Sequence, residues 1–516
     1  MRAAILALTG CLLLLQEATA RSLPGEADAT LVIFNSADPA SRELAEFYRK
    51  AREIPAENLV ALDAPLSEEI SRSEYDASIA GPLRRELLSR GLWMATRDLL
   101  NRTIVYSSKV RYAAVIRGIP LKIRQESLDY SGDAVVQESP YGSVNAASVD
   151  SELAVLGLFS PQISGILRNP FAGEGEAVPP PWLLIVSRLD GPGVPVVKDL
   201  ITSTLRAEEE GLKGWAYTDL RATSERGYAR GEEWIRRVGE LLGKNGIPVI
   251  TDTLPETISA GFPVTDAAGY FGWYAENIDG PFAMPGFRFV QGAVAVHLHS
   301  FSASTLRDPA KGWSAPLITR GACASLGNVY EPYLPFTANL GVVCSSLLAG
   351  RTLAESHCRS QSALSWMNVC VGDPLYRPYA WFGKESESDT DIWSRYRSVI
   401  LAHGGEILEA SGDLGRLAEE SGDSMPLESL GNAQFLAGKT AQAAATFRKA
   451  MSLAKDPSLI FRLRLEEARA WELSGKRDQS LTLLKAILPE EPLPVGRNLL
   501  RDWIARIEKE TKETNP

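Results

Sequence analysis

The sequence holds little of what would tie a protein to a bilayer or to nucleic acid. The apolar run at residues 3–15 falls well short of the roughly 20 residues that span a membrane, and no later segment is both longer and as apolar. Lys and Arg number 54 against 64 Asp and Glu, for a net charge of −10, with neither a basic stripe nor a block of like charge. We therefore expect no nucleic-acid partner, and no membrane span once the N-terminal segment is removed.

Residues 1–20 are predicted to be a secretory signal peptide. Arg2 supplies the one cation ahead of the apolar run, and Ala18-Thr19-Ala20 places small residues where signal peptidase needs them. We expect cleavage after Ala20 and export to the periplasm or the exterior. Two alternatives stay open. One is a short membrane anchor, and the other is a lipoprotein box ending at Cys11, which fits less well because the apolar run continues past the cysteine.

Cysteine is scarce, with five residues, and histidine scarcer, with four. Loss of the signal peptide removes Cys11 and leaves four cysteines between residues 323 and 370: Cys323, Cys344, Cys358 and Cys370. In an oxidising compartment they could form two disulfides in one of three connectivities. As free thiols they would instead act as small buried apolar residues.

Residues 28–385 alternate between strand and helix patterns. Apolar runs such as TLVIFN, YAAVI and WLLIV are separated by segments with helical spacing. The alternation predicts an α/β domain of three layers whose sheet has about seven mainly parallel strands. Ligands of such sheets bind beyond the carboxyl ends of the strands, and five polar residues fall at or just after predicted strand ends: Asn35, Arg117, Asp190, His299 and Asn328.

The C-terminal part is predicted to be helical. Residues 386–425 are charged and serine-rich and indicate a connector with helices, whereas residues 426–516 carry an internal repeat. Gly438-Lys439 recurs as Gly475-Lys476, and small and large apolar residues around both pairs resemble tetratricopeptide repeats. Two repeats are few, so we expect them to stack on the connector helices and the last helix. This region is interpreted as a docking surface for a protein partner, or else as two plain helical hairpins.

Several phrases together resemble an uncharacterised family of secreted bacterial proteins from genomes that carry exosortase sorting systems. They include YAAVIRGIPLKI, VSRLDGP, AVHLHSFSA, RGACASLGNVYEPYL and SWMNVCVGDPLYRP, and the resemblance covers about residues 28–380. It implies no established activity. The C-terminus, KETKETNP, lacks the tail of an exosortase substrate, so we expect an accessory protein of that setting and not cargo.

A second resemblance is to the caspase-like fold of gingipain-type cysteine peptidases. It rests on a strand ending in a histidine, a strand with a cysteine, and a late Gly372-Asp373-Pro374. The resemblance implies His299 as the general base and Cys323 as the nucleophile. The chain departs from that pattern in two places, because Ser300 stands where those enzymes have glycine and residues 300–320 contain no cysteine.

The stretch 269–334 holds the candidate chemistry. His297 and His299 lie two apart, hence on one face of a strand, where they could bind a metal, act as base and support, or simply pack. Cys323 is either a thiolate nucleophile or a packed strand residue. Ser300, Ser302 and Ser325 lack a GxSxG elbow. Zinc would need a third ligand, for which the acidic candidates are Asp190, Asp252, Asp266 and Glu331. No dinucleotide or Walker motif follows a predicted strand, and we expect no cofactor.

Aromatic, acidic and amide residues of the same stretch could bind a substrate. The loop GYFGWYAENIDGPF and the phrase NVYEPY offer ring faces and polar edges suited to sugars or extended peptides, unless the rings are core residues. The predicted contact residues are Trp273, Tyr274, Asn328, Tyr330, Glu331 and Tyr333, with Asp190 and Arg117. The leading hypothesis is therefore hydrolysis of a peptide or other acyl bond. The alternative is a non-catalytic accessory of the cell envelope or of export.

Overall fold

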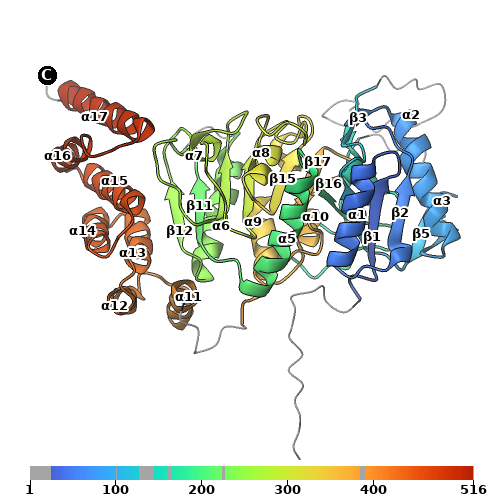
Figure 1. Cartoon of the computed structure of the whole chain (residues 1–516), viewed down its shortest axis with the longest axis horizontal. Helices are drawn as coiled ribbons and strands as arrows, with labels where there is room; N and C mark the ends of the chain where they lie inside the picture. The colour runs from blue at the N-terminus through green and yellow to red at the C-terminus, as the bar shows by residue number, and fades with distance from the viewer. Residues whose placement is uncertain are drawn as a thin grey trace, which may run out of the picture.

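A computed structural model of the chain describes residues 25–99, 101–126, 145–159, 165–222, 227–383 and 391–514. The predicted signal peptide and Cys11 lie outside the described residues. Within them, no helix is both long and apolar enough to cross a membrane. Figure 1 shows an α/β part followed, at one end of its sheet, by a stack of helices.

The α/β part is built on one sheet of ten strands. In order across the sheet these are β12 (Val249–Asp252), β11 (Trp215–Asp219), β13 (Ala267–Trp273), β14 (Val294–Leu298), β15 (Ala324–Asn328), β17 (Asn368–Gly372), β10 (Ile185–Leu189), β6 (Tyr112–Ile116), β1 (Thr30–Asn35) and β2 (Leu59–Leu62). The pairs from β12 to β15 and from β10 to β2 are parallel, whereas β17 pairs antiparallel with β15. The sheet is thus mixed and mostly parallel, with more strands than the roughly seven predicted.

Helices cover both faces of the sheet, as predicted for three layers. One face carries α1 (Pro39–Ala51), α5 (Val194–Glu210) and α8 (Ser314–Thr319). The other carries α3 (Gly81–Ser89), α4 (Val149–Ala154), α6 (Ala229–Lys244), α9 (Leu340–Leu348) and α10 (Leu353–Ser360). Because both faces are covered, the central strands are buried along their whole length.

Short elements surround this core. They are η1 (Ala56–Asn58), β3 (Glu69–Ile70), α2 (Arg72–Tyr75), η2 (Asp76–Ala80), the hairpin β4 (Trp93–Arg97) and β5 (Thr103–Ser108), β7 (Lys122–Ile123), β8 (Ala147–Ser148), β9 (Leu167–Arg168), α7 (Gly280–Ala283), η3 (Leu334–Phe336) and β16 (Ala363–Leu364).

The carboxyl ends of strands from both parts of the sheet meet at one edge. Arg307, in the segment after β14, forms an ion pair with Asp190, directly after β10. In the same segment the backbone N–H of Leu306 donates to Glu68, beyond β2, at 2.8 Å. We call this side of the sheet the carboxyl edge.

One predicted loop is a central strand. GYFGW belongs to β13, which lies between β11 and β14 and is buried throughout, and Tyr274 follows this strand. Its glycines make room for large neighbours, since a Cβ on Gly272 would lie 2.4 Å from the Tyr270 hydroxyl oxygen. The Trp273 indole fills the space that Gly231 of α6 leaves, where a Cβ would lie 2.2 Å from the ring. Glycine here permits close packing and does not mark a turn.

The helical stack consists of α11 (Ile392–Ala402), α12 (Ser411–Ser421), α13 (Met425–Leu436), α14 (Thr440–Met451), α15 (Pro457–Leu473), α16 (Arg477–Ile487) and α17 (Pro494–Thr514). Gly438 and Gly475, the repeated glycines, follow α13 and α15 with φ of 73° and 79°. Gly431 packs against Phe447, since a Cβ there would lie 2.5 Å from the ring. The repeats stack between the connector helices and α17, as expected from the sequence.

One side of the helical stack is fastened to the sheet beyond β12. Arg462 of α15 is buried and donates to Glu428 of α13 at 2.6 and 2.8 Å, and to the Tyr217 hydroxyl of β11 at 3.1 Å. Arg469 pairs with Asp252 at the end of β12 at 3.2 Å. The side formed by α13 and α15 is therefore occupied by the α/β part of the same chain and is not open to a partner.

Candidate functional site

Exposed aromatic side chains gather at the carboxyl edge, after three neighbouring strands. Tyr274 follows β13, His299 and Phe301 follow β14, and Glu331 and Tyr333 follow β15. Tyr274, Phe301 and Tyr333 are exposed by 36%, 46% and 40%, and Glu331 is also exposed. We call these five residues the aromatic platform. Three of the substrate-contact residues predicted from the sequence, Tyr274, Glu331 and Tyr333, belong to it.

Hydrogen bonds between the loops hold the platform together. The backbone N–H of Phe301 donates to the carbonyl of Tyr330 at 3.0 Å, and the Asn328 amide donates to the carbonyl of His299 at 3.1 Å. The Glu331 carboxylate accepts from the backbone N–H of Tyr333 at 3.1 Å. The segments after β14 and β15 are thus fixed side by side.

His299 presents one ring nitrogen without a partner. Its Nδ1 lies 2.5 Å from the carbonyl oxygen of Ser300, which can only accept, so Nδ1 carries a proton. Nε2 has no hydrogen-bond partner in the described part of the chain. The imidazole lies against the Tyr274 ring, with centroids 4.8 Å apart. A half-buried imidazole with an open Nε2 can accept a proton or a hydrogen bond from a ligand.

Two platform aromatics have an unfavourable backbone conformation. Phe301 has φ of 59°, and Tyr333 has φ of 59° with ψ of 137°. Glycine adopts positive φ readily, whereas a bulky L-residue does so at a cost of about 1–3 kcal/mol. Neither ring is fully buried, so burial does not offset this conformational cost. Glu53, Asn101, Ala222 and Asp266 are also exposed and have positive φ, so this conformation alone does not mark a site. Phe301 and Tyr333 differ from them in that both are large aromatic residues of the platform.

Arg221 and Tyr228 adjoin the platform and were missed from the sequence. The Arg221 guanidinium lies 5.4 Å from the Tyr228 ring centroid and 5.1 Å from that of Tyr274. The Tyr228 and Tyr274 rings meet edge to face at 5.1 Å. Burial, followed by the hydrogen bond to Tyr228, raises the pKa of Tyr274. Arg221 follows β11, so the strand-end rule that singled out Arg117 and Asp190 could have found it.

His297 is a core residue and not a catalytic one. Its ring is fully buried and stacked on Trp313, with centroids 3.6 Å apart. Nε2 accepts from the backbone N–H of Ala275 at 2.9 Å, so Nδ1 donates to the Tyr270 hydroxyl, also at 2.9 Å, and that hydroxyl donates to Asp219 at 3.0 Å. Burial, with a smaller effect from His299, lowers the histidine pKa well below its usual value. Both nitrogens are satisfied in the neutral ring.

The predicted pairing of His299 with Cys323 is wrong. Cys323 precedes β15, and its backbone N–H donates to Ala293, just before β14, at 2.8 Å. His299 lies at the other end of β14, about 20 Å away at about 3.3 Å per residue. The thiol is fully buried, and burial raises its pKa to about 12. Small residues around Cys323 reflect tight packing at the start of a strand.

The structure also shows the state of the four cysteines and of the three serines considered as nucleophiles. Cys323, Cys344, Cys358 and Cys370 are all free and buried, so no disulfide joins them. Ser302 is buried and accepts from the backbone N–H of Asn328 at 3.1 Å. Ser325 is buried against Ser314. Only Ser300 is partly exposed beside His299.

Arg117 and Asp190 belong to a separate ion network. Asp190 is buried and accepts from Arg188 at 2.9 Å as well as from Arg307, while Arg188 also binds Asp150 at 2.6 Å. Arg117 donates to the carbonyl of Gly191 at 3.2 Å. These groups tie the segment after β10 to its neighbours, and among the described residues none of these bonds reaches a platform residue. Their predicted role in substrate binding is therefore corrected to a structural one.

The remaining predicted contact residues lie beneath the platform. Trp273 is 2% exposed and packs on α6, and Asn328 is 3% exposed. Tyr330 is half-buried, with the Lys122 ammonium 5.0 Å from its ring centroid. These three support the exposed residues and do not themselves form the surface.

The acidic residues do not converge on a metal site. In the described ranges, no group of three or more His, Cys, Asp or Glu side chains is arranged to hold a metal ion. Asp252 pairs with Arg469, and Asp190 with Arg188. Buried Asp219 has one oxygen without a partner, and burial together with Asp252 raises its pKa to about 8.

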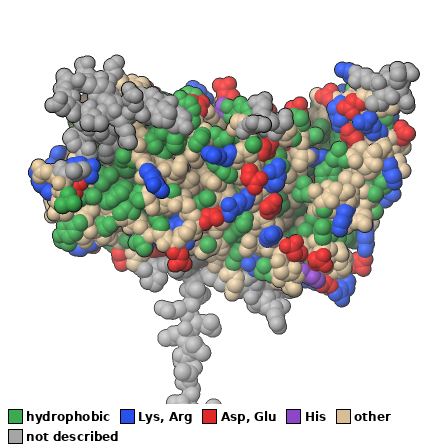
Figure 2. All heavy atoms as spheres, turned by 180° about the vertical axis from the view of Figure 1, so that it is seen from behind, with side chains coloured by type: hydrophobic (Ala, Val, Ile, Leu, Met, Phe, Trp, Pro, Cys, Tyr) green, Lys and Arg blue, Asp and Glu red, His purple; other side chains and the backbone are tan. Residues whose placement is uncertain are grey.

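Figure 2 shows basic and acidic side chains intermixed over the face it displays.

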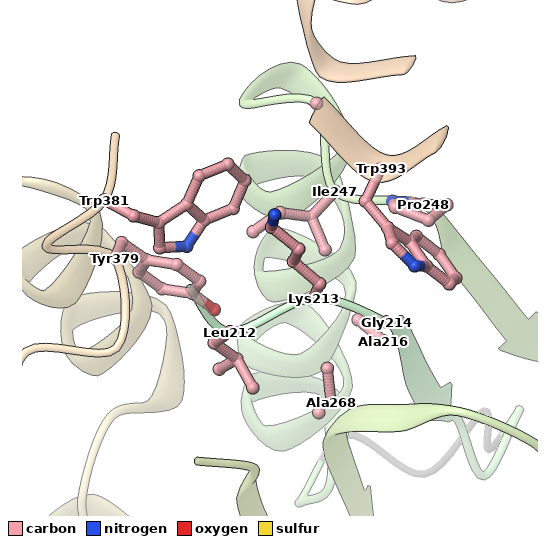
Figure 3. A pocket seen from close by; sticks show the side chains of 12 residues that line it. Leu212, Lys213, Gly214, Ala216, Ile247, Pro248, Ala268, Tyr379, Trp381 and Trp393 are labelled. Atoms are coloured by element: carbon pink, nitrogen blue, oxygen red, sulfur yellow. The ribbon is translucent and has the colours of Figure 1, made fainter. Parts of the chain in front are cut away.

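A small cavity lies at the opposite edge of the sheet, where α11 meets it. Lys213 stands between Tyr379, Trp381 and Trp393 (Figure 3), and its ammonium pairs with Asp391 at 2.9 Å. The Trp393 ring meets Trp215 edge to face at 6.3 Å. The cavity measures about 20 Å³, which is room for about one water molecule. The cavity lies where the helices pack against the sheet, and it is too small for a ligand larger than water.

Comparison of the chain with protein-family models, with curated proteins and with solved structures found no match in any of the three. The geometry of the platform is therefore the evidence that bears on function.

Proposed function

We propose that this protein is an exported accessory module of the cell envelope and that it binds an extended ligand on the aromatic platform. The observation that carries the proposal is the pair of strained, exposed aromatics, Phe301 and Tyr333, beside the open Nε2 of His299. Exposed rings stack on flat ligand faces, while Glu331 and His299 supply polar contacts at the rim. Phe301 and Tyr333 keep their exposed conformation because ligand contacts select it.

Arrays of oligosaccharides and of peptides, probed with the full exported chain, test this proposal. The strongest hit is then titrated calorimetrically against wild type and Tyr274→Ala, whose affinity should fall about tenfold through loss of stacking. Tyr106→Ala is the control, because Tyr106 is another exposed tyrosine, 52% against 36% for Tyr274, on the β4–β5 hairpin and apart from the platform. Failure of every probe to bind, or equal losses in the two variants, would reject the platform as a binding site.

Hydrolysis is the second candidate, favoured by one feature of His299. With Nδ1–H held by the Ser300 carbonyl, Nε2 is oriented to take a proton from an attacking water or from a ligand hydroxyl. No thiol takes part, because Cys323 lies at the far edge. Mass spectrometry of the bound array hit over hours decides the matter. Cleavage that is lost in His299→Gln while binding persists supports hydrolysis, and an intact ligand rejects it.

We further propose that the fold is a relative of the caspase-like fold. His299 follows one strand, and the late Gly372-Asp373-Pro374 begins at the last residue of β17, which resembles the order in that family. Asp373 has a structural task here, because it is buried and accepts from Arg52 and from Tyr48, both at 2.7 Å. We also propose that residues 426–516, whose pattern is tetratricopeptide-like, bind a protein partner through the outer side of the stack, at α14 and α16. Recovery of a partner that survives charge reversal on both helices would reject that placement.

A further inference from the structure

Arg221 is held in place without an ion-pair partner among the described residues. Its Nη1 donates to the carbonyl of Tyr274 at 3.3 Å, and the guanidinium lies beside the edge-to-face pair that the Tyr228 and Tyr274 rings form. Within the described ranges no carboxylate forms an ion pair with it. By contrast Arg188, Arg307 and Arg462 are each bound to acids. A guanidinium that is oriented by rings and still has donors to offer is suited to a carboxylate from outside the protein.

The cation is continuous with the platform. The Arg221 guanidinium lies 5.1 Å from the centroid of the Tyr274 ring. The centroids of the Tyr274 and His299 rings lie 4.8 Å apart. Glu331 forms no ion pair with Arg221 in the described residues, although it is near enough to raise the pKa of Tyr274. A ligand lying over Tyr274 therefore meets a cation at one end and an imidazole at the other.

The backbone at the platform favours a carbohydrate over a peptide. An added peptide strand needs free N–H and C=O groups on its host. Here the N–H groups of Ala275, Phe301 and Tyr333 are already bound, to His297, Tyr330 and Glu331. What the surface offers is ring faces and side-chain donors, and these match the C–H faces and substituents of sugar rings.

We propose that the platform binds a carboxylated carbohydrate, an oligosaccharide that contains uronic acid. The carboxylate pairs with Arg221, and the sugar ring that carries it lies on Tyr274. This assignment rests on the proposed binding function of the platform and names its ligand class.

The test uses the full exported chain and a panel of oligouronates of four to eight residues, each matched with its methyl ester, which lacks the charge. Calorimetry should show that the best oligouronate binds at least about tenfold more tightly than its ester, in line with a charge-assisted hydrogen bond. In Arg221→Gln the acid should weaken to the level of the ester, while Arg221→Lys should retain part of the preference. Arg288→Gln is the matched control, because Arg288 is an exposed arginine whose one side-chain bond within the described residues goes to a backbone carbonyl, that of Thr319.

The outcomes separate this inference from the proposed function. Equal binding of acid and ester that is lost in Tyr274→Ala keeps the platform and overturns the role of Arg221. Binding of oligoglutamate peptides in place of every oligouronate overturns the carbohydrate class. Binding of nothing on either array overturns the platform itself.

Discussion

Phe301 and Tyr333 keep their rings in solvent at a conformational cost. In both, the backbone adopts a positive φ that glycine would take without strain. An exposed Phe or Tyr gains little burial in return, so stability alone would favour glycine at either position. Their exposed rings are therefore accounted for by the ligand binding that we propose and not by stability.

Phe301→Gly should therefore separate stability from binding. Relief of the positive φ offsets the flexibility that glycine adds to the unfolded chain, so we expect the free energy of unfolding to change by less than about 1 kcal/mol. Loss of a buried phenylalanine would cost about 3–5 kcal/mol. Binding of the array hit should weaken severalfold. Glu53→Gly, another positive-φ residue that is exposed but remote from the platform, should leave binding unchanged. Urea titration and calorimetry measure the two effects.

The thiols should be inert in the folded protein. Burial raises the pKa of Cys323 to about 12, so at pH 8 only about one thiol in 10⁴ is ionised. Cys358 and Cys370 are raised to about 12 for the same reason. The exported chain should give no fast reaction with a disulfide reagent at pH 8, and four thiols per chain should react in denaturant. One rapidly reacting thiol in the native protein would reopen cysteine chemistry.

Asp219 should make stability fall as pH rises. In the folded chain its pKa is about 8, whereas an unfolded aspartate titrates near pH 4. Between these values the folded state holds more protons, so the free energy of unfolding decreases with rising pH, by at most about 1.4 kcal/mol per pH unit. Asp219→Asn should flatten this decline in urea titrations from pH 5 to pH 8. Asp308→Asn, which alters an exposed carboxylate, should not.

At the scale of elements, the sequence predicted the order of strands and helices well, but it did not predict the secondary structure of one glycine-rich segment. Alternation of apolar runs with helical spacing identified the α/β part, and the glycine repeat identified the helical hairpins. GYFGWY was assigned to a loop because glycine and aromatic residues together are typical of turns and surfaces. Only the fold shows that Gly272 makes room for Tyr270 and Gly231 for Trp273.

For the candidate site too, the positions of strand ends could be predicted from the sequence, whereas the register between strands could not. The strand-end rule placed His299 at the carboxyl edge, since the rule depends only on strand ends, whereas Tyr274 and Glu331 were predicted from the aromatic and polar residues of the same stretch. It could not show that Cys323 begins its strand while His299 follows the end of one, because that requires the register between β14 and β15. Positive φ at Phe301 has no signature in a single sequence either.

Gly231→Ala tests the packing of β13 on α6. The added methyl would lie 2.2 Å from the Trp273 indole, so the ring or the helix must shift, at a cost of about 1–3 kcal/mol. Gly243→Ala in the same helix is the control, because nothing lies within 4 Å of its added methyl. It should stabilise the protein by about 0.5–1 kcal/mol through helix propensity. Thermal unfolding and Trp fluorescence compare the two, and equal shifts would contradict the close packing.

For the whole molecule, the helical stack is part of one folded unit with the sheet. Arg462→Met leaves the Glu428 carboxylate buried without its partner, so we expect a loss of about 3–5 kcal/mol in the free energy of unfolding. Combining it with Glu428→Leu should recover much of that loss. Arg464→Ala breaks an exposed pair with Glu490 and should cost less than about 1 kcal/mol. A loss in Arg462→Met no larger than in this control would mean that the stack is only loosely attached.

The outer strand β12 is covered, because α13 lies against it. At the other end of the sheet, Arg90 donates to the carbonyls of Glu57 and of Leu59, the first residue of β2, at 2.7 and 2.9 Å. An uncovered outer strand recruits strands of other molecules and starts aggregation. By covering β12, the C-terminal helices thus prevent other molecules from pairing with this strand and favour solubility. A chain shortened before α11 should therefore lose soluble yield first, with fibrous or amorphous deposits formed by association at β12.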